Sequence, residues 1–210
     1  RFAGRADSRT GRFPRQARPM RRKRVAILIS GRGSNMSALI TAAKAPDYPA
    51  EIVGVFSNRA AATGLEVAAA EGIATRSLAQ SGYESREAFD MAISEVLEGW
   101  GAEIVCLAGF MRILSPAFIE RWQGRLINIH PSLLPLYRGL DTHARALADR
   151  VTEHGCSVHF VTTGLDEGPV ILQAKVPVSP DDTAETLAAR VLAEEHGLYP
   201  EALRMLAAGE

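Results

Sequence analysis

The chain has 210 residues, 47% of them hydrophobic, and a formal charge of zero at neutral pH. This length and composition suffice for one full hydrophobic core, so we expect one globular domain. The zero charge hides an asymmetry: residues 1–24 hold ten of the 24 Lys and Arg residues and a single acid, which leaves 14 basic and 23 acidic residues, a charge of −9, on the remainder. A body this acidic argues against nucleic acid as a partner.

The first segment, residues 1–22, is rich in arginine. Such a composition is typical of an organelle-targeting peptide, of a nucleic-acid-binding arm, or of upstream sequence ahead of a start at Met20. We favour the last, because the first predicted strand follows at once. We therefore expect a flexible basic extension at residues 1–22 and a single catalytic domain over residues 23–210.

Strands and helices alternate along the rest of the chain. Short apolar runs predict strands, and apolar residues three or four apart predict helices. The predicted strands are residues 24–30, 51–59, 75–78, 103–109, 125–130, 156–161 and 169–178. The predicted helices are residues 36–44, 64–72, 85–101 and a long one from Asp182 onward. We expect an α/β fold with a doubly wound, mostly parallel, Rossmann-like sheet and an antiparallel late strand pair.

Cysteine spacing and hydropathy bear on the location of the protein. Cys106 and Cys156 are fifty residues apart, which is typical of neither a disulfide framework nor a zinc site. No apolar run reaches the length of a membrane span, and the N-terminus lacks the apolar core of a secretory signal. The sequence therefore predicts a soluble cytoplasmic protein with reduced thiols and no membrane partner.

Three polar or glycine-containing segments lie at the ends of predicted strands. They are "GRGSN" (31–35), "GFMRIL" (109–114) and "NIHPSLLP" (128–135). In a doubly wound sheet, ligands bind beyond the carboxyl ends of the strands. We therefore expect these three segments to meet at one edge of the molecule.

The GRGSN segment joins a strand to a helix, so its backbone N–H groups and the helix N-terminus form an anion site. It is not a dinucleotide fingerprint, because Met36 stands where the third glycine belongs, and it lacks the lysine of a Walker A loop. The terminal phosphate of a small substrate fits best. An ordinary tight turn capped by Ser34 or Asn35 is an equal alternative.

Asn128 and His130 are two residues apart at a strand end, so their side chains project from one face. The amide can donate to a developing oxyanion while the imidazole handles protons beside it. Asp166, in a loop between the last two strands, can orient and charge that imidazole. Each of these residue types also serves ordinary turns and loops, so the hypothesis of a catalytic site depends on all three together.

Glu195 lies within the apolar stripe of the last helix, four residues after Val191 and four before Tyr199. A carboxylate in a core-facing stripe requires a partner, and a substrate amine or hydroxyl is one candidate. The alternative is a side chain that reaches solvent at the stripe edge. We expect no metal, because His154 and His159 are five apart, an odd offset that places them on opposite faces of a strand.

With "GRGSN", "AGFMRILSP", "NIHPSLLP" and "LDEGPVI" in this order, the chain resembles the glycinamide ribonucleotide formyltransferases of purine biosynthesis, from about Arg24 to the last helix. The resemblance implies transfer of the formyl group of 10-formyltetrahydrofolate to the primary amine of glycinamide ribonucleotide. These two small molecules would be its partners, no metal would take part, and the enzyme would be a monomer or a homodimer.

The resemblance also implies roles for individual residues. Asn128 would hydrogen-bond the formyl oxygen, His130 would be the adjacent acid–base group, and Asp166 would hold the imidazole and assist proton transfer. The ribonucleotide would be bound by Gly33, Ser34, Asn35 and Glu195. The folate would be bound by Arg86, Met111, Arg112, Ile113, Leu114 and Asn128.

The chain departs from the family pattern at Leu136, Arg138 and Asp141, which puts substrate affinity in question more than reaction type. A formyltetrahydrofolate hydrolase uses the same three catalytic residues but adds an N-terminal regulatory domain, and a formyltransferase for initiator tRNA adds a C-terminal RNA-binding domain. We expect neither. A non-catalytic folate- or nucleotide-binding protein stays open, although binding alone does not need the catalytic set.

Overall fold

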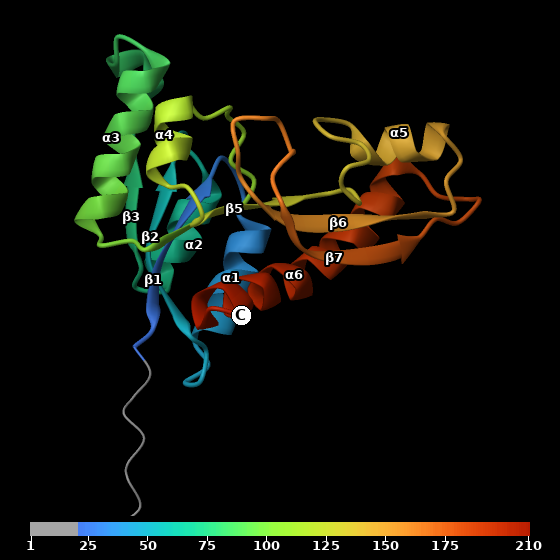
Figure 1. Cartoon of the computed structure of the whole chain (residues 1–210), viewed down its shortest axis with the longest axis horizontal. Coiled ribbons are helices and arrows are strands. Elements are labelled where there is room, and N and C mark those ends of the chain that lie inside the picture. Colours follow the sequence, from blue (N-terminus) through green and yellow to red (C-terminus); the bar gives the residue numbers. More distant parts are fainter. Residues whose placement is uncertain (1–20) are drawn as a thin grey trace, which may run out of the picture.

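The computed structural model describes residues 21–210, in which helices cover both faces of a seven-stranded sheet (Figure 1). The strands are β1 (Lys23–Ile29), β2 (Ala50–Ser57), β3 (Ala74–Ser77), β4 (Ile104–Leu107), β5 (Leu126–His130), β6 (Glu153–Phe160) and β7 (Val170–Pro177). The α-helices are α1 (Ser34–Ala43), α2 (Thr63–Ala70), α3 (Arg86–Gly99), α4 (Pro116–Arg121), α5 (Thr142–Ala148) and α6 (Ala184–Ala208), and η1 (Gln80–Gly82) is a 3₁₀ turn.

The strand order is β3-β2-β1-β4-β5-β6-β7. Strands β1 to β5 pair in parallel, whereas β6 pairs antiparallel with both β5 and β7. The predicted α/β fold with a late antiparallel pair is confirmed. The order changes direction between β1 and β4, and at this switch point the loops after the two strands diverge to leave room for ligands.

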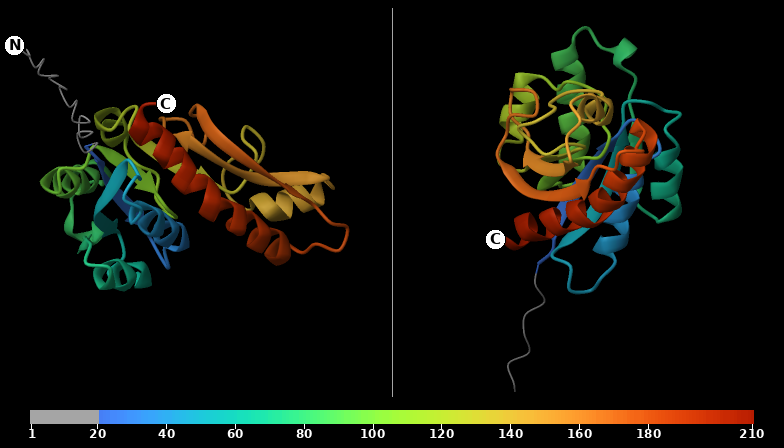
Figure 2. Two further views of the ribbon diagram at one scale, coloured as in Figure 1. Left: turned by 90° about the horizontal axis from the view of Figure 1, so that it is seen from below. Right: turned by 90° about the vertical axis from the view of Figure 1, so that its right-hand side faces the viewer.

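Two hydrophobic clusters, one on each face, hold the sheet between its helices. Alternate residues of β1 face opposite clusters, with Ile27 on the side of α1 and α6 and Leu28 on the side of α3 and α4. Both side chains are fully buried, and each such burial contributes about 1.5–3 kcal/mol. Figure 2 shows α6 running along one face of the sheet, with α3 on the other side.

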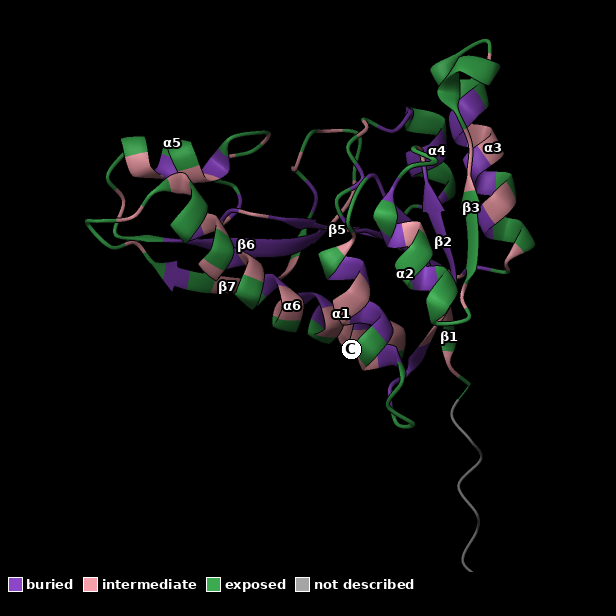
Figure 3. Ribbon diagram, turned by 180° about the vertical axis from the view of Figure 1, so that it is seen from behind, coloured by how far each residue is buried: buried purple, intermediate pink, exposed green. Residues whose placement is uncertain are grey.

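Burial differs between the two ends of the strand order. Strand β6 is buried along most of its length, whereas the edge strand β3 is largely exposed (Figure 3). The catalytic candidates on β5 therefore lie in the interior of the sheet, where β6 and its loop cover them. Within residues 21–210, no helix is long and apolar enough to cross a membrane.

Helix α6 begins one residue later than the sequence predicts. Thr183 is the N-cap, and it exchanges hydrogen bonds with Thr186 in a capping box, whereas Asp182 pairs with Arg190. Further along the helix, the buried Tyr199 hydroxyl lies within hydrogen-bond distance of two carbonyl oxygens, 3.0 Å from that of Leu107 and 3.1 Å from that of Ile127. This contact fixes the apolar stripe of α6 against β4 and β5.

Two short helices were not predicted from the sequence. Helix α4 starts at Ser115, whose side chain accepts from the Phe118 N–H, and Pro116 takes the first helical position. Helix α5 follows Asp141, which has a left-handed φ of 56° and makes no side-chain cap. The first start had a recognisable signal, whereas the second has none in the local sequence.

The described chain begins with residues that contact the domain. The Arg22 guanidinium donates to the carbonyl oxygens of Tyr48 at 3.0 Å and Ala50 at 2.5 Å, and also contacts that of Ala43. These bonds tie the entry of β1 to the C-terminal end of α1. The prediction of a basic extension over residues 1–22 otherwise lies outside the described residues.

Candidate active site

Two adjoining cavities lie at the carboxyl ends of the parallel strands, and both are lined by Asn128 and Phe110. The first extends toward the "MRIL" segment and the loop at residues 161–166. The second extends toward Asn35 and Glu195 and the loop at residues 139–143. The predicted convergence of the three strand-end segments is therefore present, with Asn128 at the junction.

Asn128 is held by a histidine that the sequence argument had weighed only as a metal ligand. The two residues are opposite each other in the β5–β6 pairing, and the Asn128 Nδ2 lies 3.2 Å from Nε2 of His159. On the other side of the ring, Nδ1 lies 2.9 Å from the carbonyl oxygen of Phe160, so it must carry a hydrogen. Burial lowers the pKa of His159, in keeping with a neutral ring whose Nε2 accepts from the amide. Asn128 thereby keeps its second N–H free to donate to a ligand.

His130 has an acceptor at each ring nitrogen. Its Nε2 lies 3.0 Å from the carbonyl oxygen of Tyr137, and its Nδ1 lies 3.4 Å from Oδ2 of Asp166. A carbonyl oxygen can only accept, so Nε2 carries the hydrogen of the bond to Tyr137, and Nδ1 faces the carboxylate. The carboxylate is therefore placed to stabilise a positive charge on this buried ring, directly beside the Asn128 amide.

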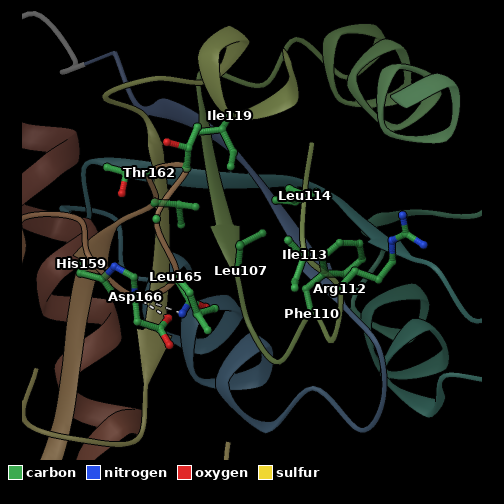
Figure 4. Close-up of a pocket in the computed structure, with 14 residues that line it drawn as sticks. Leu107, Phe110, Arg112, Ile113, Leu114, Ile119, His159, Thr162, Leu165 and Asp166 are labelled. Carbon is green, nitrogen blue, oxygen red and sulfur yellow. Dashed lines mark hydrogen bonds and ion pairs between the residues drawn. The ribbon is translucent and has the colours of Figure 1, made fainter. Parts of the chain in front are cut away.

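Asp166 adopts a left-handed backbone with φ of 51°, which asparagine and aspartate tolerate better than other side chains. Its Oδ2 accepts from the Gly139 N–H at 2.9 Å, and its Oδ1 lies 3.6 Å from Nε2 of His159. The carboxylate therefore joins two loops and lies between two imidazole rings. Figure 4 shows Asp166 and His159 together at one end of the first cavity.

The ribonucleotide candidates lie at the start of α1. Gly33 is the N-cap, with a left-handed φ of 71° and no side-chain cap, so the N–H groups of the first turn point outward uncapped. Asn35 is buried, and its Nδ2 donates to Oε2 of Glu195 at 2.6 Å, although 160 residues separate the two. Burial raises the pKa of Glu195, while the Asn35 bond lowers it.

The two predicted alternatives for this end of the site can now be compared. Glu195 is 6% exposed, so the alternative of a carboxylate reaching solvent at the stripe edge is wrong. Oδ1 of Asn35 is buried without a partner within residues 21–210. A buried acceptor beside a buried carboxyl is a polar site that calls for hydrogen-bond donors from a ligand. Gly33 and Ser34 do not line either cavity, so their contact with a phosphate stays a prediction.

The residues predicted to bind the folate differ in exposure and in position relative to the first cavity. Met111 and Ile113 are 62% and 69% exposed and form an apolar rim, whereas Leu114 is buried. The Arg112 side chain points away from His159 and Asp166, as Figure 4 shows, so this residue lines the cavity from its other end. Arg86 lies in the first turn of α3, lines neither cavity and pairs with Glu87 at 3.6 Å, so its folate contact stays a prediction.

A second histidine pair lies beneath the proline-containing loop. His154 on β6 points Nε2 at Nδ1 of His143, 3.2 Å away, and the Tyr137 ring packs against it. Burial lowers the pKa of His154 to about 4. Nothing in the local sequence connects α5 to β6, so this pair could not be predicted from the sequence. Within residues 21–210, no cluster of three or more His, Cys, Asp or Glu residues has the geometry to hold a metal ion.

The model of the formyl transferase family matches residues 23–203. The chain belongs to this family. The phosphoribosylglycinamide formyltransferase of Escherichia coli K12 is 51% identical over 185 residues, which cover 88% of this chain and 87% of that protein. The bovine trifunctional purine biosynthetic protein adenosine-3 is also 51% identical, but the chain spans only 19% of its length.

Solved structures of the formyl transferase family share the fold. Phosphoribosylglycinamide formyltransferase from Brucella melitensis is 56% identical with a TM-score of 0.86, over 90% of this chain and 98% of that chain. Glycinamide ribonucleotide transformylase 1 from Symbiobacterium toebii is 46% identical with a TM-score of 0.87, over 90% and 89%. The similarity extends over nearly all of residues 21–210, including both cavities.

Proposed function

We propose that this protein transfers the formyl group of 10-formyltetrahydrofolate to the primary amine of glycinamide ribonucleotide, in purine biosynthesis. One observation carries the proposal: two cavities with different linings open on the same Asn128 amide, and the second also contains the His130 imidazole. The first contains the apolar side chains of Leu107, Phe110 and Leu114 and suits the planar ring of a folate. The second contains Asn35 and Glu195 and suits a polar ribonucleotide. The relatives named phosphoribosylglycinamide formyltransferase support this assignment.

The substrate contacts follow from this arrangement. We assign the phosphate to the uncapped first turn of α1, at Gly33 and Ser34, because backbone N–H groups there favour an anion. We assign the ribose or amide of the ribonucleotide to Asn35 and Glu195. The folate ring is assigned to the main chain of residues 111–114, with Arg86 near the same co-substrate.

The reaction begins when the amine nitrogen attacks the formyl carbon. A new C–N bond forms, and the π electrons of the C=O group move onto oxygen. Asn128 donates an N–H to this oxyanion, and the charged His130 ring adds a positive charge beside it. A preorganised donor of this kind contributes about 3–4 kcal/mol to transition-state stabilisation.

The tetrahedral intermediate collapses when the bond from the formyl carbon to N10 breaks and its electron pair returns to N10. The amine loses one proton and N10 gains one, so the reaction has no net proton change. Asp166, through a water and the His130 ring, provides the relay between the two nitrogens. The mechanism uses two small-molecule co-substrates and no metal, and each site is complete in one chain, whether monomer or homodimer.

The test is the formation of folate product from 10-formyl-5,8-dideazafolate, followed by absorbance, with and without glycinamide ribonucleotide. Turnover that requires the ribonucleotide is the expected result. Equal turnover in its absence would make water the acceptor and the protein a hydrolase. Absence of turnover in both mixtures, with retained folate binding, would contradict any catalytic assignment.

A further inference from the structure

Asp90 is a fully buried carboxylate on α3, outside both cavities. It lies on the helix face that carries the buried Phe89 and Ile93 toward the sheet. An ionised carboxylate in such surroundings is unfavourable unless it is paired and hydrogen-bonded. A carboxylate buried at this position is therefore expected to have specific partners and a specific role.

Both oxygens of Asp90 are engaged by the segment that lines the first cavity. Oδ1 lies 3.3 Å from Nη2 of Arg112, and Oδ2 accepts from the Ser115 N–H at 2.6 Å. One carboxylate therefore holds the two ends of residues 112–115. No other acidic side chain pairs with Arg112 within residues 21–210.

The Arg112 side chain is anchored away from the catalytic end of the cavity. It extends away from the catalytic end of the cavity, as Figure 4 shows, and its guanidinium lies 4.6 Å from the centre of the Phe89 ring. It also contacts the Gln80 side chain. With 11% of its side chain exposed, Arg112 is held between α3 and η1.

The main chain between the two anchors is left unpaired. Among residues 21–210, the N–H and C=O groups of Ile113 and Leu114 have no hydrogen-bond partner, although Leu114 is only 5% exposed. Backbone groups this buried are normally satisfied. A planar heterocycle with donors and acceptors along one edge is the ligand that would satisfy them.

We propose that Asp90 is a positioning residue for the folate co-substrate. Through Arg112 and Ser115, it fixes the main chain of residues 112–115 in the one conformation that presents its free N–H and C=O groups to the ring edge. This inference rests on the proposed function, because it takes the planar ligand of the first cavity to be the folate.

Asp90→Asn keeps the volume and removes the charge. The amide can still accept from the Ser115 N–H, but it then turns its NH₂ group toward the Arg112 guanidinium, so one anchor is lost. We expect the dissociation constant of 10-formyl-5,8-dideazafolate to rise at least about tenfold, the effect of losing one charge-assisted hydrogen bond. The KM for the ribonucleotide and kcat at saturation should stay within about twofold, which a general loss of structure would not allow.

Glu98→Gln is the matched control. Glu98 also links α3 to α4, through a bidentate pair with Arg121 at 2.5 and 2.8 Å, but both side chains are 41% exposed. Its removal should leave folate binding unchanged. The same rise in both variants would overturn the proposal, because it would make general α3–α4 contact the cause.

Arg112→Met supplies a second variant that keeps the bond from Ser115 to Asp90. It should weaken folate binding as well. The double variant Asp90→Asn with Arg112→Met should bind folate no more weakly than the weaker-binding single variant, because both substitutions break the same Asp90–Arg112 pair. If Asp90→Asn binds folate as tightly as wild type, the role of Asp90 is refuted. If Asp90→Asn does not fold, wild-type folate affinity in Arg112→Met refutes it instead. Folate binding is measured by fluorescence without ribonucleotide, so a wild-type protein that binds folate but does not transfer formyl would contradict the proposed function alone.

Discussion

Replacing Asp166 with asparagine removes one charge and almost no volume. Asparagine accepts the left-handed backbone at this position, and its carbonyl can still accept from the Gly139 N–H. The same carbonyl oxygen still faces Nδ1 of His130, and the NH₂ group lies toward Nε2 of His159. The carboxylate charge beside the His130 ring is lost, whereas the contact between the ring and the Tyr137 carbonyl is kept.

The size of the effect follows from the geometry of the pair. Two unit charges 3.4 Å apart, the distance from Asp166 to His130, attract by about 5 kcal/mol at an effective dielectric constant of 20. The cost of burying both groups offsets part of this attraction. We expect the loss of this attraction to raise the barrier by about 3–4 kcal/mol, and so to lower kcat about 10²–10³-fold.

The assay compares kcat for wild type and Asp166→Asn with both co-substrates saturating, and measures thermal stability and dideazafolate binding on the same samples. The melting temperature should be unchanged, because backbone and volume are conserved. A variant that keeps more than about a third of the wild-type kcat, well above the range expected from the barrier, would refute the reasoning. It would show that the negative charge of Asp166 contributes little to the reaction.

Two further predictions concern pH and stability. Burial raises the pKa of Glu195, so its contribution to stability is present below the ordinary value of 4.5 and is lost as pH rises through the folded pKa. Glu195→Gln should therefore be more stable than wild type at pH 7, by about 0.5–2 kcal/mol. It should also raise the KM for the ribonucleotide. Equal stability of the two proteins at pH 7, measured by denaturant titration, would contradict the role of the Glu195 charge. Burial lowers the pKa of His154 to about 4, so stability from the neutral ring is present above 6.5 and is lost as pH falls through about 4. His154→Phe should show a weaker fall in melting temperature between pH 6.5 and 4, and an identical fall in both proteins would exclude His154 as the cause.

The sequence predicted the parts of the site that depend on local pattern. Asn128 and His130 share a face because strand geometry requires it, and the three strand-end segments converge because parallel strands end at one edge. The position of Glu195 in an apolar stripe predicted that its carboxylate has a partner. Each of these inferences needed only neighbouring residues or the fold class.

The remaining parts depend on pairings that no local pattern contains. Asn128 meets His159 only because β6 runs antiparallel to β5 in one particular register, and a slip of one residue would turn the histidine away. Asn35 meets Glu195 across 160 residues. Nothing in the local sequence distinguishes Asp90 from other polar residues of α3, and its burial against the "MRIL" segment is seen only in the fold.

The junction of the two cavities at Asn128 also bears on how an activated acyl group is protected. In the proposed reaction, a formyl carbon beside the amide faces the first cavity on one side and the second cavity on the other. An amine held there competes at an effective molarity that can reach about 10⁵ M or more, far above any solvent nucleophile. A water molecule in the second cavity is not held in this way and has no such advantage. The amine that accepts the formyl group therefore also occupies the space from which a water molecule could attack the formyl carbon. Binding of the acceptor thereby protects the formyl group from hydrolysis.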